Sequence, residues 1–222
     1  MTRQDLYIGE VKNKQDLMAF IRFPWEIYKG DRYWVPPLIK DQLSKLSPNH
    51  PFRSHSEMIL FMADKGGQTV GRIAGIIDHH YIKFHQENVG FFGFFESTAD
   101  AEVAEMLLSK VGKWLKEHGM ENMVGPMNPS TNDECGLLVE GFDVSPCLMM
   151  PYNPRYYLSL LEGFGLKKAM DLYAYWIEES FFLDDRLFRI TERLIKRDPQ
   201  LWVRPIKLRH LDEELQLSLI HI

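Results

Sequence analysis

Hydrophobic residues recur along the chain with two different periods, which together predict a mixture of strands and helices. Apolar positions over 104–115 are spaced three and four residues apart, follow a polar segment and end before Gly119, which predicts an amphipathic helix. Two apolar runs, 58–63 and 69–78, flank a glycine turn and predict a β-hairpin. Residues 89–96 predict a further strand, in which Gly90 and Gly93 favour a bulge or the close approach of another backbone or ligand.

The elements on either side follow from the same reasoning. Residues 7–11 predict a strand, and Asn13 is placed to cap a helix that runs until Pro24. The segment 28–52 is rich in proline, glycine and aromatic residues, which predicts an ordered surface loop or arm.

Beyond the amphipathic helix, the pattern predicts a short strand at 122–125, a helix at 155–162 and an alternating strand at 169–177. The order along the chain is therefore strand, helix, hairpin, strand, helix, strand, helix, strand.

The end of the chain repeats its beginning. A helix at 184–197 precedes a strand at 202–208 and a helix that opens at Asp212, as a strand and an acid-capped helix also open the chain. We therefore expect a first domain over 1–180, a connecting helix over 181–200 and the truncated start of a second, similar domain over 201–222. The apolar last residues resemble translated adapter sequence more than a native terminus.

Composition and charge are those of an ordinary globular protein. Of the 222 residues, 45% are hydrophobic and 26% are charged, which suffices for a substantial core. Lys and Arg number 26 against 31 Asp and Glu, a formal net charge of −5, so we expect no nucleic acid partner. No apolar stretch approaches the roughly 20 residues that span a bilayer, so we expect no membrane partner either.

The termini, cysteines and histidines indicate a soluble, cytoplasmic protein without a metal. The N-terminus lacks a basic start followed by an apolar run, the pattern of a secretory signal. Cys135 and Cys147 have neither CxxC spacing nor the density of a disulfide scaffold. His79, His80 and His85 lack the spacing of a metal site, which favours surface histidines at a strand end.

Five blocks of sequence, taken in order, resemble one bacterial group of GNAT (Gcn5-related N-acetyltransferase)-like proteins. These blocks are FPWEIYKGD with WVPPL in 23–38, GRIAGIID at 71–78, GFFGFFE at 90–96, GPMNPSTNDECGLL at 125–138 and YNPRYY at 152–157. The resemblance implies an α/β (α+β) fold with a mixed central sheet flanked by helices, in two tandem halves of which this chain holds the first. It also implies acyl transfer from acetyl-CoA or another acyl-CoA to a small-molecule amine or other acyl acceptor.

The same resemblance implies where CoA would bind and raises a conflict there. Backbone groups of the central strand and the turn after it would contact the cofactor, which points to Phe94, Phe95 and Ser97. The family's turn carries glycines and a cation, whereas residues 97–102 have neither and place Asp100 and Glu102 near the expected diphosphate. These acids suit the helix dipole and would repel the ligand, so we expect this half to be degenerate at the pyrophosphate turn.

Candidate catalytic residues follow from the resemblance and from acyl-transfer chemistry. The family often carries a tyrosine four residues before a Gly-Phe pair, but that position is Ser159 here. The proton donor would therefore be Tyr156 or Tyr157 through a shifted helix register, and we take Tyr157 as the candidate. A general base for the incoming amine would be Glu96, at the end of the central strand, or Glu134 in the polar loop.

The polar segment 128–134 is the best candidate for binding the acceptor, because such loops on a rigid scaffold often carry function. With the nearby aromatic block it gives the substrate-binding candidates Asn128, Ser130, Thr131, Asn132, Tyr152 and Asn153. Two alternatives stay open: the segment is a hydrogen-bonded turn network, and the protein is a non-catalytic module that binds a small ligand or a protein. The phenylalanines at 91, 92, 94 and 95 favour packing in a core covered on both faces over an acyl pocket.

Overall fold

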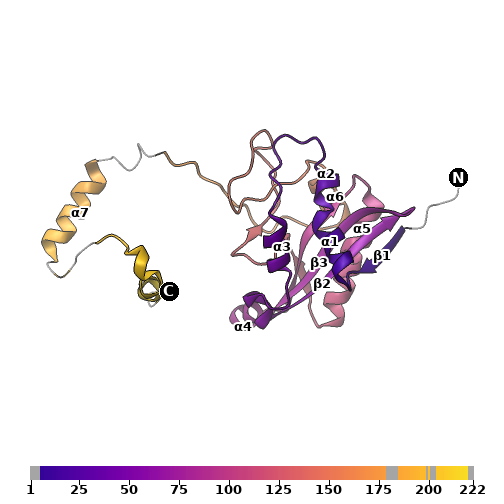
Figure 1. The fold of residues 1–222 in the computed structure, drawn as a ribbon, viewed down its shortest axis with the longest axis horizontal. Coiled ribbons are helices and arrows are strands. Elements are labelled where there is room, and N and C mark those ends of the chain that lie inside the picture. Colours follow the sequence, from indigo (N-terminus) through magenta and orange to yellow (C-terminus); the bar gives the residue numbers. More distant parts are fainter. Residues whose placement is uncertain (1–5, 179–184, 199, 201–203, 220–222) are drawn as a thin grey trace. The chain divides into compact units, whose positions relative to one another are not determined.

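A computed structural model describes residues 6–178, 185–198, 200 and 204–219 (Figure 1). The chain divides into two units, residues 1–172 and 173–222. The sequence placed the end of the first domain at residue 180, and the start of a second GNAT-like domain stays a prediction. The elements of the first unit are β1 (Leu6–Glu10), α1 (Lys14–Arg22), α2 (Pro24–Ile27), α3 (Ile39–Lys45), η1 (Pro51–Ser54), β2 (Ser56–Lys65), β3 (Gln68–Asp78), α4 (His79–His85), β4 (Val89–Ser97), α5 (Ala101–Glu117), β5 (Asn122–Val124), β6 (Met127–Asn128), β7 (Glu134–Cys135) and α6 (Tyr157–Phe164).

The strands form a mixed sheet in the order β1-β2-β3-β4-β5. The first four strands pair antiparallel, and β5 pairs parallel to β4 through residues 122–124. The predicted hairpin is β2 and β3, whose turn places Gly66 and Gly67 at φ of 61° and 80°. The predicted helix cap is also confirmed, because the Asn13 side chain accepts a hydrogen bond from the backbone N–H of Asp16.

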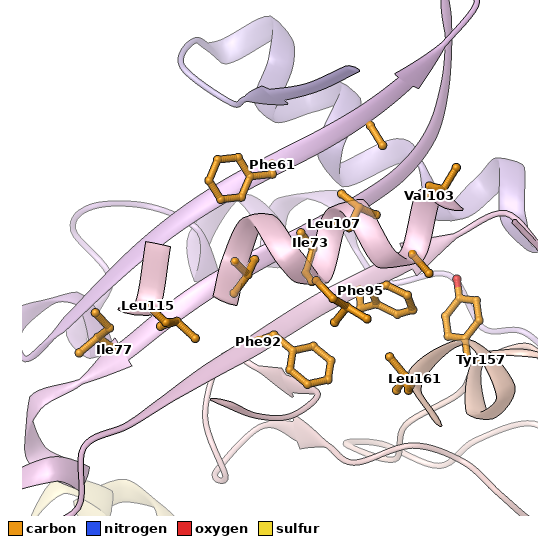
Figure 2. Close-up of a cluster of buried hydrophobic side chains, with 14 residues drawn as sticks. Phe61, Ile73, Ile77, Phe92, Phe95, Val103, Leu107, Leu115, Tyr157 and Leu161 are labelled. Atoms are coloured by element: carbon orange, nitrogen blue, oxygen red, sulfur yellow. The ribbon is translucent and has the colours of Figure 1, made fainter. Parts of the chain in front are cut away.

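Helices cover both faces of this sheet, so β3 and β4 are buried on both sides. α5 and α6 pack on one face, where Phe92, Phe95 and Tyr157 belong to a single cluster (Figure 2). α1 and residues of α3 lie over the other face, where Phe91 and Phe94 are buried. The expectation that these four phenylalanines form core rather than an open pocket is confirmed.

A bulge in β4 explains why Phe91 and Phe94, three residues apart, lie on one face of the sheet while Phe92 and Phe95 lie on the other. The register between β3 and β4 shifts so that Phe94 and Phe95 stand opposite the single residue Ile73. Phe94 has φ of 49°, a left-handed conformation that non-glycine residues seldom adopt. The bulge lies beyond Phe91, the last residue of β4 that pairs with β5, and it reorients the backbone of the strand there.

The close backbone approach predicted for the glycine-containing strand occurs at Gly93. A Cβ on Gly93 would lie 1.6 Å from the backbone oxygen of Met127, so only glycine fits there. The short β6 and β7 strands pair with each other, with Asn128 opposite Glu134, and thereby hold residues 127–135 as a hairpin beside β4.

The predicted strand at 169–177 is wrong: residues 166–178 have no regular structure. An alternating strand is stable only when a neighbouring strand satisfies its backbone, and within the described residues no such pairing exists for this segment. Its large side chains are therefore exposed, Tyr175 by 81% and Trp176 by 82%.

Short helices in the arm and at the end of β3 were not predicted, whereas the two helices predicted at 184–197 and from Asp212 are confirmed. The arm over 28–52 contains α3 and η1, and α4 forms at the end of β3, where Asp78 caps it by accepting from the backbone of His80 and Tyr81. In the second unit, α7 (Asp185–Arg197), η3 (Leu208–His210) and α8 (Leu211–Leu219) are present. The predicted strand at 202–208 lies partly outside the described residues, and 204–207 have no regular structure.

Candidate active site

The bulged strand β4 ends in a buried carboxylate that faces a buried guanidinium. Glu96 Oε1 lies 3.5 Å from Arg72 Nη2 on β3, and the two side chains are only 12% and 7% exposed. Arg72 also donates from Nη1 to the backbone oxygen of Phe20 at 2.7 Å, with its guanidinium 4.9 Å from the Phe20 ring centre. A buried charge persists when it is paired and hydrogen-bonded, which is the case for Glu96.

Two tyrosine hydroxyls donate to the other oxygen of the same carboxylate. Tyr157 on α6 donates to Glu96 Oε2 at 2.6 Å, and Tyr28, directly after α2, donates to the same atom at 3.0 Å. The Tyr157 hydroxyl also accepts from the backbone N–H of Ser97 at 2.9 Å, and Tyr156 donates to the Ser97 carbonyl at 2.7 Å. The carboxylate is therefore fixed by groups from three other segments, namely β3, α6 and the residue that follows α2.

Burial dominates the electrostatics of this cluster. Burial raises the pKa of Glu96, although the Arg72 charge and the tyrosine hydrogen bonds oppose the rise. Burial, together with the Glu96 charge, raises the pKa of Tyr28 and of Tyr157 well above the usual tyrosine value. Near neutral pH both tyrosines therefore remain protonated donors, and Glu96 is a stronger base than an exposed glutamate.

Aromatic side chains of the arm surround the Tyr28 side of the cluster. The Tyr28 ring stacks on Trp34 at 4.8 Å, and Trp25 meets Trp34 edge-on at 5.2 Å. Tyr152 joins this wall: its backbone oxygen accepts from the Tyr28 hydroxyl at 3.2 Å, and its own hydroxyl donates to Asp31 at 2.8 Å. We call the rings of Trp25, Tyr28, Trp34 and Tyr152 the aromatic wall.

Beyond Phe91, where the pairing with β5 ends, side chains form hydrogen bonds to the outer edge of β4. Asn128 Oδ1 accepts from the backbone N–H of Phe94 at 2.6 Å. With the bonds of Tyr157 and Tyr156 to Ser97, the N–H of Phe94 and both polar backbone groups of Ser97 are already engaged. The third, Phe95, buries its ring against Tyr157 at 5.2 Å.

The other predicted substrate-binding residues are mostly engaged in local structure. Ser130 donates to Asp133 at 2.9 Å and accepts from the backbone of Asn132 at 3.2 Å, and Thr131 is exposed beside them. Glu134, the alternative candidate for the general base, is half-buried on β7. The carboxamide of buried Asn153 accepts from the Leu138 N–H at 2.7 Å and donates to the carbonyls of Leu138 and Pro154. The segment 128–134 thus contains the turn network that was one of its two interpretations.

The N-terminus of α5 does not fit a diphosphate. Asp100 caps this helix by accepting from the backbone N–H of Glu102 at 3.0 Å. Lys65 bridges the two acids, 2.8 Å from Asp100 and 3.3 Å from Glu102, and its hydrogen bond lowers the pKa of Asp100. The Glu102 amide and the Lys65 cation are therefore both bonded by the chain's own carboxylates, whose negative charge at this turn opposes a phosphate.

Three further findings concern metal sites, a surface hollow and membrane spans. Across the described ranges, no group of three or more His, Cys, Asp or Glu side chains is arranged to hold a metal ion. An open hollow lies between the end of α5 and β5, lined by Leu115, Met120 and Met123 among others, at the opposite end of β4 from Glu96. In the part of the chain that the structure covers, no helix is long and apolar enough to cross a bilayer.

Comparison with known proteins gives two similar sequences of about twice the length. The chain is 34% identical over 221 residues to Protein YghO of Escherichia coli (strain K12), which covers 98% of this chain and 56% of that protein. It is also 34% identical over 219 residues to a bacterial ceramide synthase of Caulobacter vibrioides (strain NA1000 / CB15N), which covers 97% and 56%. The chain therefore spans about half the length of the curated relatives it matches. No family model matches it.

Solved structures with a similar arrangement include two acetyltransferases. AAC(6')-Iy in complex with the bisubstrate analog CoA-S-monomethyl-acetylneamine aligns with 78% of this chain and 99% of its own, at 14% identity and a TM-score of 0.48. An aminoglycoside acetyltransferase from an uncultured soil metagenomic sample, in complex with trehalose, aligns with 78% and 97%, at 12% identity and a TM-score of 0.45.

From β1 to α6, the chain has the strand and helix order and the mixed sheet that its sequence resemblance implies. The fold is GNAT-like. Within this GNAT-like domain the structure brings Glu96 and Tyr157 into direct contact, as two of the predicted catalytic residues.

Sequence reasoning missed Arg72 and Tyr28 as parts of the site of the GNAT-like domain. Arg72 carried a usable signal, because it is the one charged residue in the apolar run 70–77 and a buried cation needs a buried partner. Tyr28 lies 68 residues from Glu96 in sequence, in an arm without periodicity, and nothing in the local pattern marks its contact.

Proposed function

We propose that the intact protein transfers an acyl group from acyl-CoA to an amine, and that this domain holds and deprotonates the amine. The observation that carries the proposal is the Glu96 carboxylate: buried at the end of the central strand, oriented by two tyrosine hydroxyls and of raised pKa. A base that is fixed in place and has a pKa nearer neutrality suits general base catalysis.

In the proposed reaction the amine nitrogen forms a bond to the acyl carbon, the bond from that carbon to sulfur breaks with its electron pair leaving on sulfur as the CoA thiolate, and the amine loses one proton. Glu96 accepts this proton. Tyr28 and Tyr157 keep Oε2 occupied with their hydrogen bonds, which leaves Oε1, the oxygen nearer to Arg72, to receive it. Arg72 then neutralises the negative charge of the carboxylate whenever the proton leaves again.

For the acceptor we propose a long-chain amino alcohol. The relative from Caulobacter vibrioides is named a ceramide synthase, and a ceramide is the amide of such an amine, so that name supports N-acylation of a lipid amine. The aromatic wall beside Glu96 agrees with a ligand whose body is apolar, because stacked rings offer contact area and few hydrogen-bond partners.

The CoA nucleotide does not fit the N-terminus of α5, where Asp100 and Glu102 hold Lys65. We therefore propose that the remainder of a protein of the relatives' length holds the nucleotide, and that this domain provides the acceptor side. Because acyl-CoA is the proposed donor, we assign the reaction to the cytoplasm.

A second candidate is a non-catalytic binding module, which the capped edge of β4 favours. If Asn128, Tyr156 and Tyr157 keep their bonds to Phe94 and Ser97, the Phe94 N–H and the N–H and carbonyl of Ser97 stay closed to a ligand. The domain would then recognise its ligand or partner without supplying a base.

An acyl-transfer assay with the full-length protein separates the two candidates. Glu96→Gln keeps the shape of the side chain but cannot accept a proton, so we expect kcat for acylation of a long-chain amino alcohol to fall by about 10²–10⁴. Glu105→Gln, on the exposed face of α5, is the matched control and should retain wild-type activity. Equal kcat values for the two variants would remove Glu96 as the base and favour the binding module.

A further inference from the structure

The strained residue of β4 presents its backbone amide to a side chain that resembles a ligand. Phe94 has φ of 49°, and such strain in a non-glycine residue often accompanies a functional site. Its N–H points out of the sheet edge, where no strand pairs with it, and donates to the carboxamide oxygen of Asn128 at 2.6 Å. A carboxamide oxygen and an acyl carbonyl oxygen are the same kind of acceptor for this N–H.

The Phe94 amide lies on the same strand as Glu96, which suggests a role for it in acyl transfer. Phe94 and Glu96 are two residues apart on β4, on either side of the bulged residue Phe95. When an amine attacks an acyl group, negative charge develops on the carbonyl oxygen, and a fixed backbone N–H stabilises that charge. An N–H at Phe94 and a base at Glu96 would serve the two ends of one attack.

We propose that Asn128 is a gate: its carboxamide fills the position of the acyl carbonyl on the Phe94 amide, and a thioester reaches β4 only when Asn128 withdraws. This inference rests on the proposed acyl transfer, because it assigns the amide to an acyl carbonyl. It goes beyond that proposal by naming the residue that keeps the site closed.

Contacts within the hairpin and with α3 hold the gate in place. β6 pairs with β7, Ser130 bonds to Asp133 at 2.9 Å, and Asp133 forms an ion pair with Lys45 of α3 at 3.1 Å. The Ser130–Asp133 and Asp133–Lys45 contacts involve no residue of β4, whereas β6 itself packs on β4, so withdrawal of Asn128 requires the hairpin to separate from the strand at Gly93. The backbone of Met127, which passes close to Gly93, would move with the hairpin.

The experiment uses a thioester without a diphosphate, because Asp100 and Glu102 would repel one. S-acetylpantetheine and pantetheine are titrated separately into ¹⁵N-phenylalanine-labelled protein, and binding and hydrogen exchange are followed at the Phe94 amide by NMR. In Asn128→Ala we expect faster exchange of this amide and about fivefold tighter binding of S-acetylpantetheine, the value of one competing hydrogen bond. Pantetheine, which lacks the thioester carbonyl, should bind both proteins equally.

Two further variants keep the test decisive. Asp133→Ala loosens the hairpin without touching β4 and should shift binding in the same direction, which covers the case that Asn128→Ala folds poorly. Asn49→Ala removes an exposed asparagine elsewhere and should change nothing.

Unchanged Phe94 exchange in Asn128→Ala, equal tightening of both ligands, or no S-acetylpantetheine binding by Asn128→Ala and Asp133→Ala would each overturn the gate. The acyl-transfer assay of the full-length protein decides the proposed function independently. A gate that passes this test in a protein without acyltransferase activity would mean a carbonyl-binding module.

Discussion

Tyr157→Phe is the sharpest test of the buried cluster, because it removes a single oxygen atom that makes two hydrogen bonds. The Tyr157 hydroxyl donates to Glu96 at 2.6 Å and accepts from the Ser97 N–H at 2.9 Å, and the side chain is only 1% exposed. The ring itself stays in place against Phe95, so the substitution creates almost no cavity.

The expected cost follows from these two contacts. A hydrogen bond to a charged group contributes about 1.5–3 kcal/mol, and a buried donor left without a partner costs about 1–3 kcal/mol. Because Glu96 keeps Tyr28 and Arg72, we expect a combined loss of about 3 kcal/mol of unfolding free energy. For a domain of this size that corresponds to a fall in Tm of about 6–12 °C.

Urea unfolding, followed both by circular dichroism and by tryptophan fluorescence, measures this loss. Tyr156→Phe is the matched control: it removes one neutral hydrogen bond, from a half-buried hydroxyl to the Ser97 carbonyl, and should cost about 1 kcal/mol. In a double-mutant cycle with Tyr28→Phe, the two losses should not add, because both hydroxyls donate to the same oxygen of Glu96. A Tyr157→Phe loss no larger than that of Tyr156→Phe, or strictly additive losses in the cycle, would refute the reasoning.

Three other changes test the electrostatics, the close approach and the helix cap. Burial raises the pKa of Glu96, so its contribution to stability is complete below the ordinary value of about 4.3 and is lost as the pH rises through the raised folded value. The unfolding free energy of Glu96→Gln, measured at several pH values, should lack this decline, and parallel pH profiles for the two proteins would contradict it. Gly93→Ala should cost more than about 3 kcal/mol by collision with the Met127 backbone, whereas Gly112→Ala, in open space on α5, should stabilise by about 0.5–1 kcal/mol in thermal unfolding. Asp100→Ala removes the cap of α5 and should cost about 1 kcal/mol in the same assay, and an unchanged Tm would argue against the cap.

The elements that the sequence predicted well are those whose pattern repeats over a long stretch. The helix α5 and the strands β2, β3 and β4 each carry enough apolar positions to reveal their period, and each is buried against a neighbour. The strand predicted at 169–177 has an equally clear alternation and is nevertheless unpaired. Alternation reports that a segment can pair, while pairing itself depends on an edge that the local sequence does not describe.

The candidate site was predictable in its residues but not in its connections. Glu96 and Tyr157 could be proposed separately from position and family pattern, and the structure brings them into contact, which the sequence did not predict. Asn128 was predicted to contact a ligand, which stays a prediction, and in the structure its side chain accepts from the backbone N–H of Phe94, a contact that the sequence did not indicate. The last contact depends on a bulge and on a neighbouring hairpin, and neither leaves a periodic signal in the sequence.

The stack of Trp34 on Tyr28 also makes the site optically visible. Tyr28 touches the carboxylate with its hydroxyl and the indole of Trp34 with its ring, so a change of charge at Glu96 alters the surroundings of a fluorophore one contact away. Trp34 emission is thus an intrinsic reporter of proton uptake at Glu96, and it allows the occupancy of the site to be followed without a label and without knowledge of the substrate.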